Sequence, residues 1–134
     1  MLRVATGIII KDKKILLLKR AEQENFEAGK WCPVNETIEQ ETPEQAVVRG
    51  VQEEIGVNFT IKKKLFEKVG DDMNKKVKNG AIAYVFLGTI RGKINPNPKE
   101  VSEYRYFTYP EALRLTFAFD YIDVIKKLHN LNLI

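Results

Sequence analysis

Two adjacent glutamates, Glu53 and Glu54, follow Arg49 by about one helical turn in the stretch AVVRGVQEEIG. If this stretch is helical, the three side chains lie close together, because residues three and four apart are neighbours on a helix. Mg²⁺ prefers oxygen ligands and needs few protein carboxylates when water and substrate phosphate complete its shell. The spacing therefore makes this face a candidate magnesium site. An isolated acidic pair is also common on solvated helix faces, where Arg49 would only offset Glu53.

Gly50 is the unexpected residue of this stretch. Glycine inside a helix is less favourable than alanine by about 1 kcal/mol. At helical spacing, Gly50 is the neighbour of both glutamates and lies at the centre of the expected polar face. The apolar stripe on the other side consists of Val47, Val48, Val51 and Ile55. The sequence thus raises the question of what a glycine does beside two carboxylates.

The ends of this helix are clearly marked. Thr42 can cap the first turn, and Gln45 completes a Thr-x-x-Gln capping box. Pro43 fits the first turn, where its missing N–H costs nothing. Gly56 is a usual stop signal for a helix. The sequence therefore predicts a helix between Thr42 and Gly56.

The elements around the helix are indicated by hydrophobic periodicity and turn residues. Strands rich in β-branched and aromatic residues are expected at 3–11, 14–19, 57–69, 81–92 and 103–109. A short extended piece is expected at 31–34, and polar loops or turns are expected at 21–30, 71–80 and 95–100. Further helices are expected to begin near 110 and to cover 120–131. This order predicts an α/β (α+β) fold in which helices cover a mixed β-sheet.

The bulk composition narrows the class of protein. The chain has 134 residues, a length that fits one domain spanning residues 1–134. Its net charge is +4. No apolar run approaches the roughly 20 residues that a membrane helix needs, so we expect no membrane partner. No zinc-finger spacing or nucleic-acid motif is present, so we expect no nucleic-acid polymer as partner. The single cysteine, Cys32, and the lack of signal-peptide features favour a reducing cytoplasm.

A longer pattern gives the carboxylate pair a specific meaning. Residues 35–57, NETIEQETPEQAVVRGVQEEIGV, resemble the Nudix box, which places a spaced Glu, an Arg-Glu pair, a Glu-Glu pair and a Gly at set intervals. Here the spaced glutamate is Glu41, and Arg49, the paired glutamates and Gly56 match without a gap. The resemblance is closest to the MutT branch of nucleoside triphosphate pyrophosphatases. It extends to KEVSEYRYF, which resembles the late acidic loop and strand of the family.

The resemblance implies a fold, an activity and a set of site residues. The fold would be a mixed sheet with helices on both sides, and the box would form a loop, a helix and a second loop. The reaction would be attack of water on a diphosphate linkage in a nucleotide, with Mg²⁺ or Mn²⁺ as cofactor. Glu53, Glu54 and Glu100 would bind the metal, with Glu100 as a possible base. Arg49 would orient a box glutamate, and Arg20 would lie near the substrate.

The sequence departs from the box at several positions. Asn35 replaces the first glycine, and asparagine tolerates left-handed turns better than most residues. The box glutamate that follows Arg49, a principal metal ligand in the family, is Gly50 here. No neighbour on the same helix face fills this gap. The carboxylates that could complete the site are Glu41, Asp71, Asp72 and Glu103.

These departures leave two functional interpretations open, and a third in which Gly50 is a cloning change or an isolated change in one lineage. The chain is either a hydrolase, whose activity the loss at Gly50 reduces, or a nucleotide-binding or regulatory module without turnover. Trp31, Phe26, Tyr84 and Phe119 could stack on a base, although such aromatic residues more often pack in a core. Asp120 or Tyr121 stands where the branch that reads oxidised guanine has an amide, so we do not expect that specificity. The expected partner is a phosphorylated small molecule, and the chain would be a monomer or homodimer.

Overall fold

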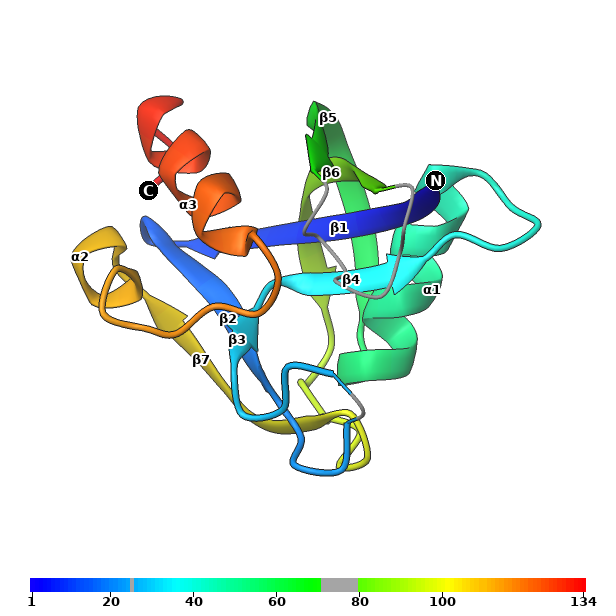
Figure 1. Ribbon diagram of the computed structural model, residues 1–134, viewed down its shortest axis with the longest axis horizontal. Coiled ribbons are helices and arrows are strands. Elements are labelled where there is room, and N and C mark those ends of the chain that lie inside the picture. Colours follow the sequence, from blue (N-terminus) through cyan, green and yellow to red (C-terminus); the bar gives the residue numbers. More distant parts are fainter. Residues whose placement is uncertain (25, 71–79) are drawn as a thin grey trace.

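A computed structural model describes residues 1–24, 26–70 and 80–134 of the chain (Figure 1). Its strands are β1 (Leu2–Lys11), β2 (Lys14–Arg20), β3 (Trp31–Cys32), β4 (Val34–Thr37), β5 (Asn58–Gly70), β6 (Ala81–Arg91) and β7 (Val101–Phe107). Its helices are α1 (Pro43–Ile55), α2 (Tyr109–Ala112) and α3 (Tyr121–Asn130). The turn expected at 71–80 lies almost wholly outside the described residues, and so do the candidate carboxylates Asp71 and Asp72.

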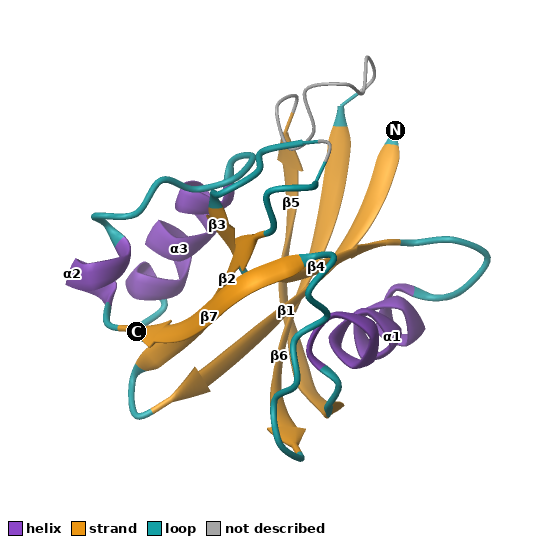
Figure 2. Ribbon diagram, turned by 90° about the horizontal axis from the view of Figure 1, so that it is seen from below, coloured by secondary structure: helices purple, strands orange, loops and turns teal. Residues whose placement is uncertain are grey.

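The long strand β1 organises the sheet. It runs parallel to β6 and antiparallel to β2 and β4, while β5 pairs with β6, and both β3 and β7 pair with β2. In Figure 2, α1 lies on one side of the strands, and α2 and α3 lie on the other. The predicted α/β (α+β) fold with a mixed sheet between helices is therefore confirmed.

The apolar runs of β1 and β2 are buried on both faces of the sheet. Successive side chains of a strand point to opposite faces, so Ile8 packs in the core under α3 while Ile9 packs in the core under α1. In β2, Leu17 belongs to the first core and its neighbours Leu16 and Leu18 to the second. Two cores on one sheet explain why these strands read as continuous apolar runs rather than as alternating patterns.

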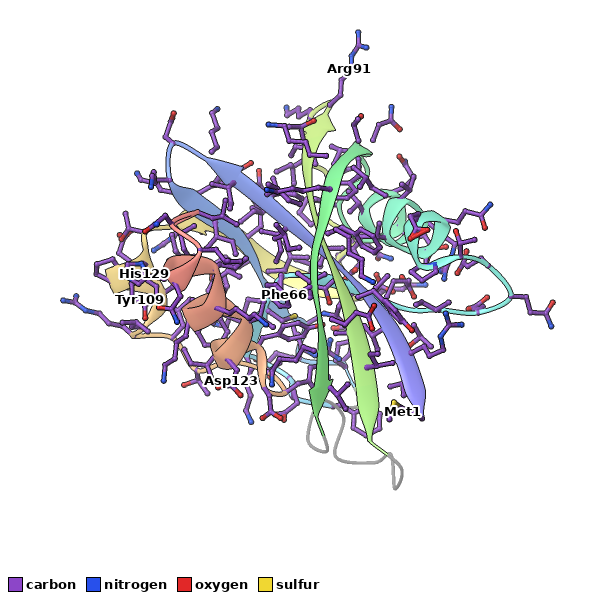
Figure 3. All side chains as sticks on the ribbon, turned by 90° about the horizontal axis from the view of Figure 1, so that it is seen from above. Met1, Phe66, Arg91, Tyr109, Asp123 and His129 are labelled. Carbon is purple, nitrogen blue, oxygen red and sulfur yellow. The ribbon has the colours of Figure 1, made fainter. Side chains whose placement is uncertain are left out.

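Helices α2 and α3 are held to each other and to the sheet by aromatic contacts and a hydrogen bond. The rings of Tyr109 in α2 and His129 in α3 stack with centroids 3.8 Å apart (Figure 3). The Lys127 ammonium of α3 lies 4.4 Å from the ring centroid of Phe66 in β5. The hydroxyl groups of Tyr121 and Thr6 are 2.8 Å apart, which ties the start of α3 to β1.

Helix α1 begins and ends where its boundary signals predict. Thr42 and Gln45 form the complete capping box, and Gly56 ends the helix in the left-handed conformation at φ 69°. Two assignments of helix faces were wrong. Val48, placed in the apolar stripe, is exposed, and Gly50, placed at the centre of the polar face, is buried. Gly50 is buried because strand β4 packs against this side of α1, which periodicity within the helix does not reveal.

The segment before α1 also differs from expectation. Residues 34–37, expected largely as a lead-in to the helix, form strand β4 beside β1. Asn35 pairs with Thr6 in that ladder and is not among the described residues with positive φ. Its tolerance for left-handed turns is therefore not used. The other strands and helices agree with the prediction within a few residues. None of the described helices combines the length and apolarity of a membrane span.

Candidate active site

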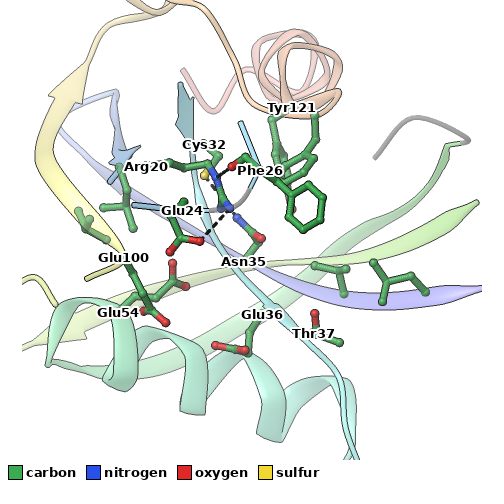
Figure 4. A pocket seen from close by; sticks show the side chains of 15 residues that line it. Arg20, Glu24, Phe26, Cys32, Asn35, Glu36, Thr37, Glu54, Glu100 and Tyr121 are labelled. Atoms are coloured by element: carbon green, nitrogen blue, oxygen red, sulfur yellow. Dashed lines mark hydrogen bonds and ion pairs between the residues drawn. The ribbon is translucent and has the colours of Figure 1, made fainter. Parts of the chain in front are cut away.

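A cavity of about 240 Å³ opens between α1, β4, the end of β2 and the start of α3 (Figure 4). Its charged lining comes from five separate segments of the chain. The charged residues are Arg20 from β2, Glu24 from the following loop, Glu36 from β4, Glu54 from α1 and Glu100 from the loop before β7. The tertiary fold thus gathers four carboxylates and one guanidinium around a single space.

Glu54 is the most deeply enclosed of these carboxylates. It lies in the last turn of α1, and the backbone N–H of Asn35 donates to it. Its Oε2 atom is shielded from solvent and has no hydrogen-bond partner among the described residues. Burial raises the pKa of Glu54 well above its ordinary value, and the nearby charges of Glu36 and Glu100 raise it further.

Glu100 is carried by a loop that is fastened to the end of α1. The backbone N–H of Asn97 donates to the Glu54 carbonyl over 2.8 Å, and that of Glu100 donates to the Asn97 carbonyl over 3.0 Å. On the other side, the Ala21 N–H donates to the Glu100 carbonyl over 2.9 Å. The Oε2 atom of Glu100 is also buried without a partner among the described residues. Burial, and then the charges of Glu24 and Glu53, raise the pKa of Glu100.

Glu36 reaches the cavity from β4 and lies against Gly50. A Cβ atom built on Gly50 would be 2.7 Å from Glu36 Cβ, 3.3 Å from its Cγ and 3.4 Å from its Oε2. Glu36 therefore fills the space that a side chain at position 50 would enter. Burial raises the pKa of Glu36 to about 7, against the opposing charge of Arg49.

Arg49 connects the carboxylates on this side of α1. Its Nε lies 3.2 Å from both carboxylate oxygens of Glu41, and its Nη2 donates to the Thr37 carbonyl over 3.0 Å. Its Nη1 lies 3.2 Å from Glu53 and 3.5 Å from Glu36. The hydrogen bonds from Arg49 lower the pKa of Glu41, and that contact also raises the pKa of Arg49. Arg49 is thus a positioning residue whose strongest partner is Glu41.

Arg20 forms the positive part of the cavity. Its Nε donates to the Phe26 carbonyl over 3.0 Å, and its Nη2 lies 3.4 Å from Glu24. The guanidinium carbon is 5.1 Å from the centroid of the Phe119 ring, a distance typical of cation–π contact. Phe119 and Tyr121 line the same space, so the cavity has an aromatic end next to its charged end.

The structure brings together only some of the residues selected from the sequence. Arg20, Glu54 and Glu100 line the cavity. Glu53 does not line it, because its side chain is 51% exposed and pairs with Arg49, although its charge raises the pKa of Glu36 and Glu100.

Of the three residues selected from the sequence for substrate contact, Arg20 lines the cavity, whereas Trp31 and Asp120 do not. Trp31 packs in the core, edge to face with Phe107 at 5.0 Å between ring centroids. Asp120 is the N-cap residue of α3, and its neighbour Tyr121 reaches the cavity instead.

Two acidic residues of the cavity were not selected from the sequence. Glu24 falls in a polar loop and Glu36 in the irregular start of the box, and no helical or strand spacing relates either of them to Glu54. A weak signal existed for Glu36. Val34 is buried under α1, so the alternation of a strand would have put Glu36 on the same side.

The donor set suits a hard divalent cation. Glu54 and Glu100 each present a buried carboxylate oxygen without a partner among the described residues, and a cation would satisfy both. In the described part of the chain, no three acidic, histidine or cysteine side chains already converge closely enough to hold an ion together. Mg²⁺ is commonly bound by one or two protein carboxylates together with water and phosphate oxygens. The residues present therefore fit such an ion.

The fold and the cavity define a class of α+β protein in which carboxylates line a cavity beside the mixed sheet. The sequence model of the NUDIX domain family matches residues 1–128. The chain therefore belongs to the Nudix family, as residues 35–57 predicted. No curated protein matches the sequence.

Solved structures with the same fold include several Nudix proteins. A MutT protein from Methanosarcina mazei Go1 has 23% identity and a TM-score of 0.82, with 98% of this chain and 94% of that chain covered. The ORF135 protein of E. coli has 24% identity and a TM-score of 0.77, with 98% and 91% covered. The NUDIX domain of Shewanella oneidensis NrtR, solved with ADP ribose, has 17% identity and a TM-score of 0.78, with 97% and 87% covered.

Proposed function

We propose that this chain is a divalent-metal-dependent hydrolase that cleaves the diphosphate linkage of a nucleotide. The observation that carries the proposal is a pair of buried oxygens, one on Glu54 and one on Glu100, that have no partner in the described part of the chain. Both residues line one cavity together with Arg20. Buried charges without partners are costly unless a cation or proton compensates them. A substrate with several phosphates needs a cation and an arginine in one place, and this cavity offers both.

Different side chains of the site would bind the metal ion and the substrate phosphates. Glu54 and Glu100 would hold Mg²⁺ or Mn²⁺, and Glu53 would join them if it left its ion pair with Arg49. The bound ion would offset phosphate charge and lower the pKa of an attacking water. Arg49 keeps the acidic side of α1 in place through Glu41 and Thr37. Arg20 would bind a phosphate oxygen in exchange for Glu24.

The aromatic end of the cavity suits a nucleoside. Phe119 is partly exposed and presents ring surface beside Arg20, and stacking on such a ring tolerates different bases. The Tyr121 side chain is buried and its hydroxyl lies 2.8 Å from that of Thr6, so we do not assign it a role in reading the base. The NrtR domain was solved with ADP ribose. ADP-ribose is therefore one of the substrates to test here, next to nucleoside triphosphates.

Product release from a substrate panel tests this proposal. Nucleoside triphosphates, ADP-ribose and dinucleoside polyphosphates would be incubated with Mg²⁺ or Mn²⁺, and products would be separated by chromatography. We expect turnover by the wild type and a loss of about 100-fold or more in Glu54→Gln, which removes an electrostatic contribution to the transition state. Glu44→Gln is the matched control, because Glu44 is exposed on the same helix and does not line the cavity.

A nucleotide-binding or regulatory module without turnover is the second candidate function. The observation that favours it is Gly50, which removes the box carboxylate after Arg49. The same panel separates the two functions when nucleotide binding is measured in parallel by calorimetry. Binding without product from any substrate would support the module and refute the hydrolase.

A further inference from the structure

The carboxylate missing from helix α1 has a replacement on a different element. We propose that Glu36 supplies, from strand β4, the carboxylate that α1 lacks at Gly50, and that Glu36, Glu54 and Glu100 together form the cation site. This inference rests on the proposed function, because it assigns a third ligand to the same site. It also gives Gly50 a role, since the glycine makes room for the replacing side chain.

The first argument is the contact between β4 and α1. A Cβ atom at position 50 would lie 2.7 Å from the Cβ of Glu36, closer than two such atoms approach in proteins. The Cβ of Glu36 is fixed to the backbone of β4, so it cannot rotate away. Any side chain at position 50 would therefore push the strand off the helix. The Glu36 side chain occupies the path that a side chain from position 50 would take.

The second argument is the direction of Glu36. Side chains two residues apart in a strand share a face, and Val34 of β4 packs in the core under α1. Across the ladder, Glu36 pairs with Ala5, which belongs to the same core. Glu36 therefore points toward α1 at the edge of that core, where the cavity opens. It lines the cavity with Glu54 and Glu100, and its charge acts on Glu54 (Figure 4).

The third argument is that the two other described carboxylates considered from the sequence, Glu41 and Glu103, are ion-paired with arginines or lie outside the cavity. Glu41, considered from the sequence, is the main partner of Arg49, with both oxygens 3.2 Å from the Arg49 Nε. Glu103 is exposed on β7 and lies 3.7 Å from Arg105, outside the cavity lining. Glu36 makes one ion pair among the described residues, a 3.5 Å contact with Arg49, and Arg49 has closer partners. Of Glu36, Glu41 and Glu103, Glu36 is thus the one best able to turn toward an ion. Such a turn is required, because among the described residues no three carboxylates already converge closely enough to hold an ion.

Calorimetric titration of the metal-stripped protein with Mn²⁺ alone tests the inference. We expect the wild type to bind and Glu36→Gln to bind at least about tenfold more weakly, in line with the effect of losing a group around a metal. Glu44→Gln, the same chemical change on an exposed part of α1, should match the wild type. Circular dichroism checks that each variant is folded. Wild-type affinity in folded Glu36→Gln would overturn the inference and leave the proposed function standing.

An exchange of the two residues provides the sharper test. Glu36→Gly combined with Gly50→Glu keeps the composition and charge of the chain but moves the carboxylate from β4 to α1. We expect the exchange to restore Mn²⁺ affinity relative to Glu36→Gly alone. Gly50→Glu alone should lower the unfolding temperature, because the Glu36 Cβ is still in place. Lack of Mn²⁺ binding in the wild type would refute the proposed function itself. If the double variant binds Mn²⁺ no more tightly than Glu36→Gly alone, the inference that Glu36 replaces the carboxylate missing at position 50 is overturned.

Discussion

At the scale of single residues, the site depends on whether each negatively charged carboxylate has a positively charged partner. Glu41 is neutralised by Arg49, whereas Glu36, Glu54 and Glu100 are partly buried and their charges repel one another. Their pKa values are raised mainly by burial, which disfavours the charged form. Strongly perturbed groups in one cavity are typical of functional sites. The same residues that suit a cation therefore destabilise the metal-free protein.

Glu36→Gln should stabilise the metal-free protein at neutral pH but not in acid. The pKa of Glu36 is about 7 in the fold against 4.5 ordinarily, so the folded protein holds this proton more tightly than the unfolded chain. That stabilisation is present below about pH 4.5 and is lost as the pH rises to about 7. Between about pH 4 and pH 8, the free energy of unfolding of Glu36→Gln should rise relative to wild type by about 1–3 kcal/mol.

Urea unfolding in EDTA at the two pH values, with Glu44→Gln as control, provides the measurement. A difference between Glu36→Gln and wild type that is independent of pH would show that the Glu36 carboxyl titrates normally.

Gly50→Ala should destabilise the fold, which reverses the usual sign of this change in a helix. Alanine is ordinarily better than glycine in a helix by about 1 kcal/mol. Here its Cβ would lie 2.7 Å from the Glu36 Cβ, and such overpacking typically costs about 1–3 kcal/mol. In the Glu36→Gly background the clash is absent, so the same Gly50→Ala change should become neutral or stabilising. A double-mutant cycle by chemical denaturation measures the coupling, and additive effects would contradict the close contact.

At the scale of elements, α1 and its two flanking segments build the site as a unit. The helix carries Glu54 in its last turn, β4 brings Glu36 to its side, and the loop before β7 is hydrogen-bonded to its end. The Asn95 N–H donates to the Ile55 carbonyl over 2.8 Å, and Asn97 binds the next free carbonyl, that of Glu54. These bonds satisfy carbonyls that a helix end leaves open. The position of Glu100 therefore depends on where α1 ends.

Thr42→Ala should lower the free energy of unfolding by about 1 kcal/mol, because the Thr42 side chain accepts the Gln45 N–H at the start of α1. The cap lies far along the helix from Glu54, so Mn²⁺ affinity of the folded variant should stay close to that of the wild type. Urea unfolding and calorimetry give the two values. Gln52→Ala, at an exposed position inside α1, is the control, and an equal loss there would argue against a specific role of the cap.

At the scale of the whole molecule, the cavity lies where the two cores of the sheet meet the helices on either side. Glu54 comes from the α1 side, while Tyr121 and Phe119 come from the α3 side. The hydrogen bond between Tyr121 and Thr6 and the contact between Arg20 and Phe119 join these halves. A ligand that bridges acidic and aromatic ends of the cavity would therefore stabilise the complete fold and not one element.

Mn²⁺ or Mg²⁺ should raise the unfolding temperature of the wild type in a concentration-dependent way. A ligand that binds only the folded state at 100 times its Kd adds about 2.7 kcal/mol, and here it also removes the repulsion among the buried carboxylates. Glu54→Gln should show a much smaller rise, and Glu44→Gln the same rise as the wild type. Differential scanning calorimetry provides the test. An equal rise in Glu54→Gln would place the cation elsewhere on the molecule.

The sequence alone determined most of the architecture of this protein. Caps at Thr42 and Gly56 and the strand periodicity are local signals, and local hydrogen bonds and burial fix the elements they mark. The pattern over residues 35–57 also predicted the family that the match over residues 1–128 confirms. The resemblance to the Nudix family also predicted Glu54 and Glu100 as metal ligands, and both residues line the cavity.

Only the tertiary structure decided which residues share the cavity and what Gly50 does. Residues 36 and 50 belong to different elements, and no spacing rule relates a strand residue to a helix residue across a packed interface. Their contact depends on how closely β4 approaches α1, and that approach is set by the packing of Val34 and its neighbours under the helix. The burial of the Glu54 Oε2 atom and the position of Trp31 in the core are likewise consequences of packing. Local patterns specify elements, whereas the distances between side chains on different elements exist only once the cores have formed.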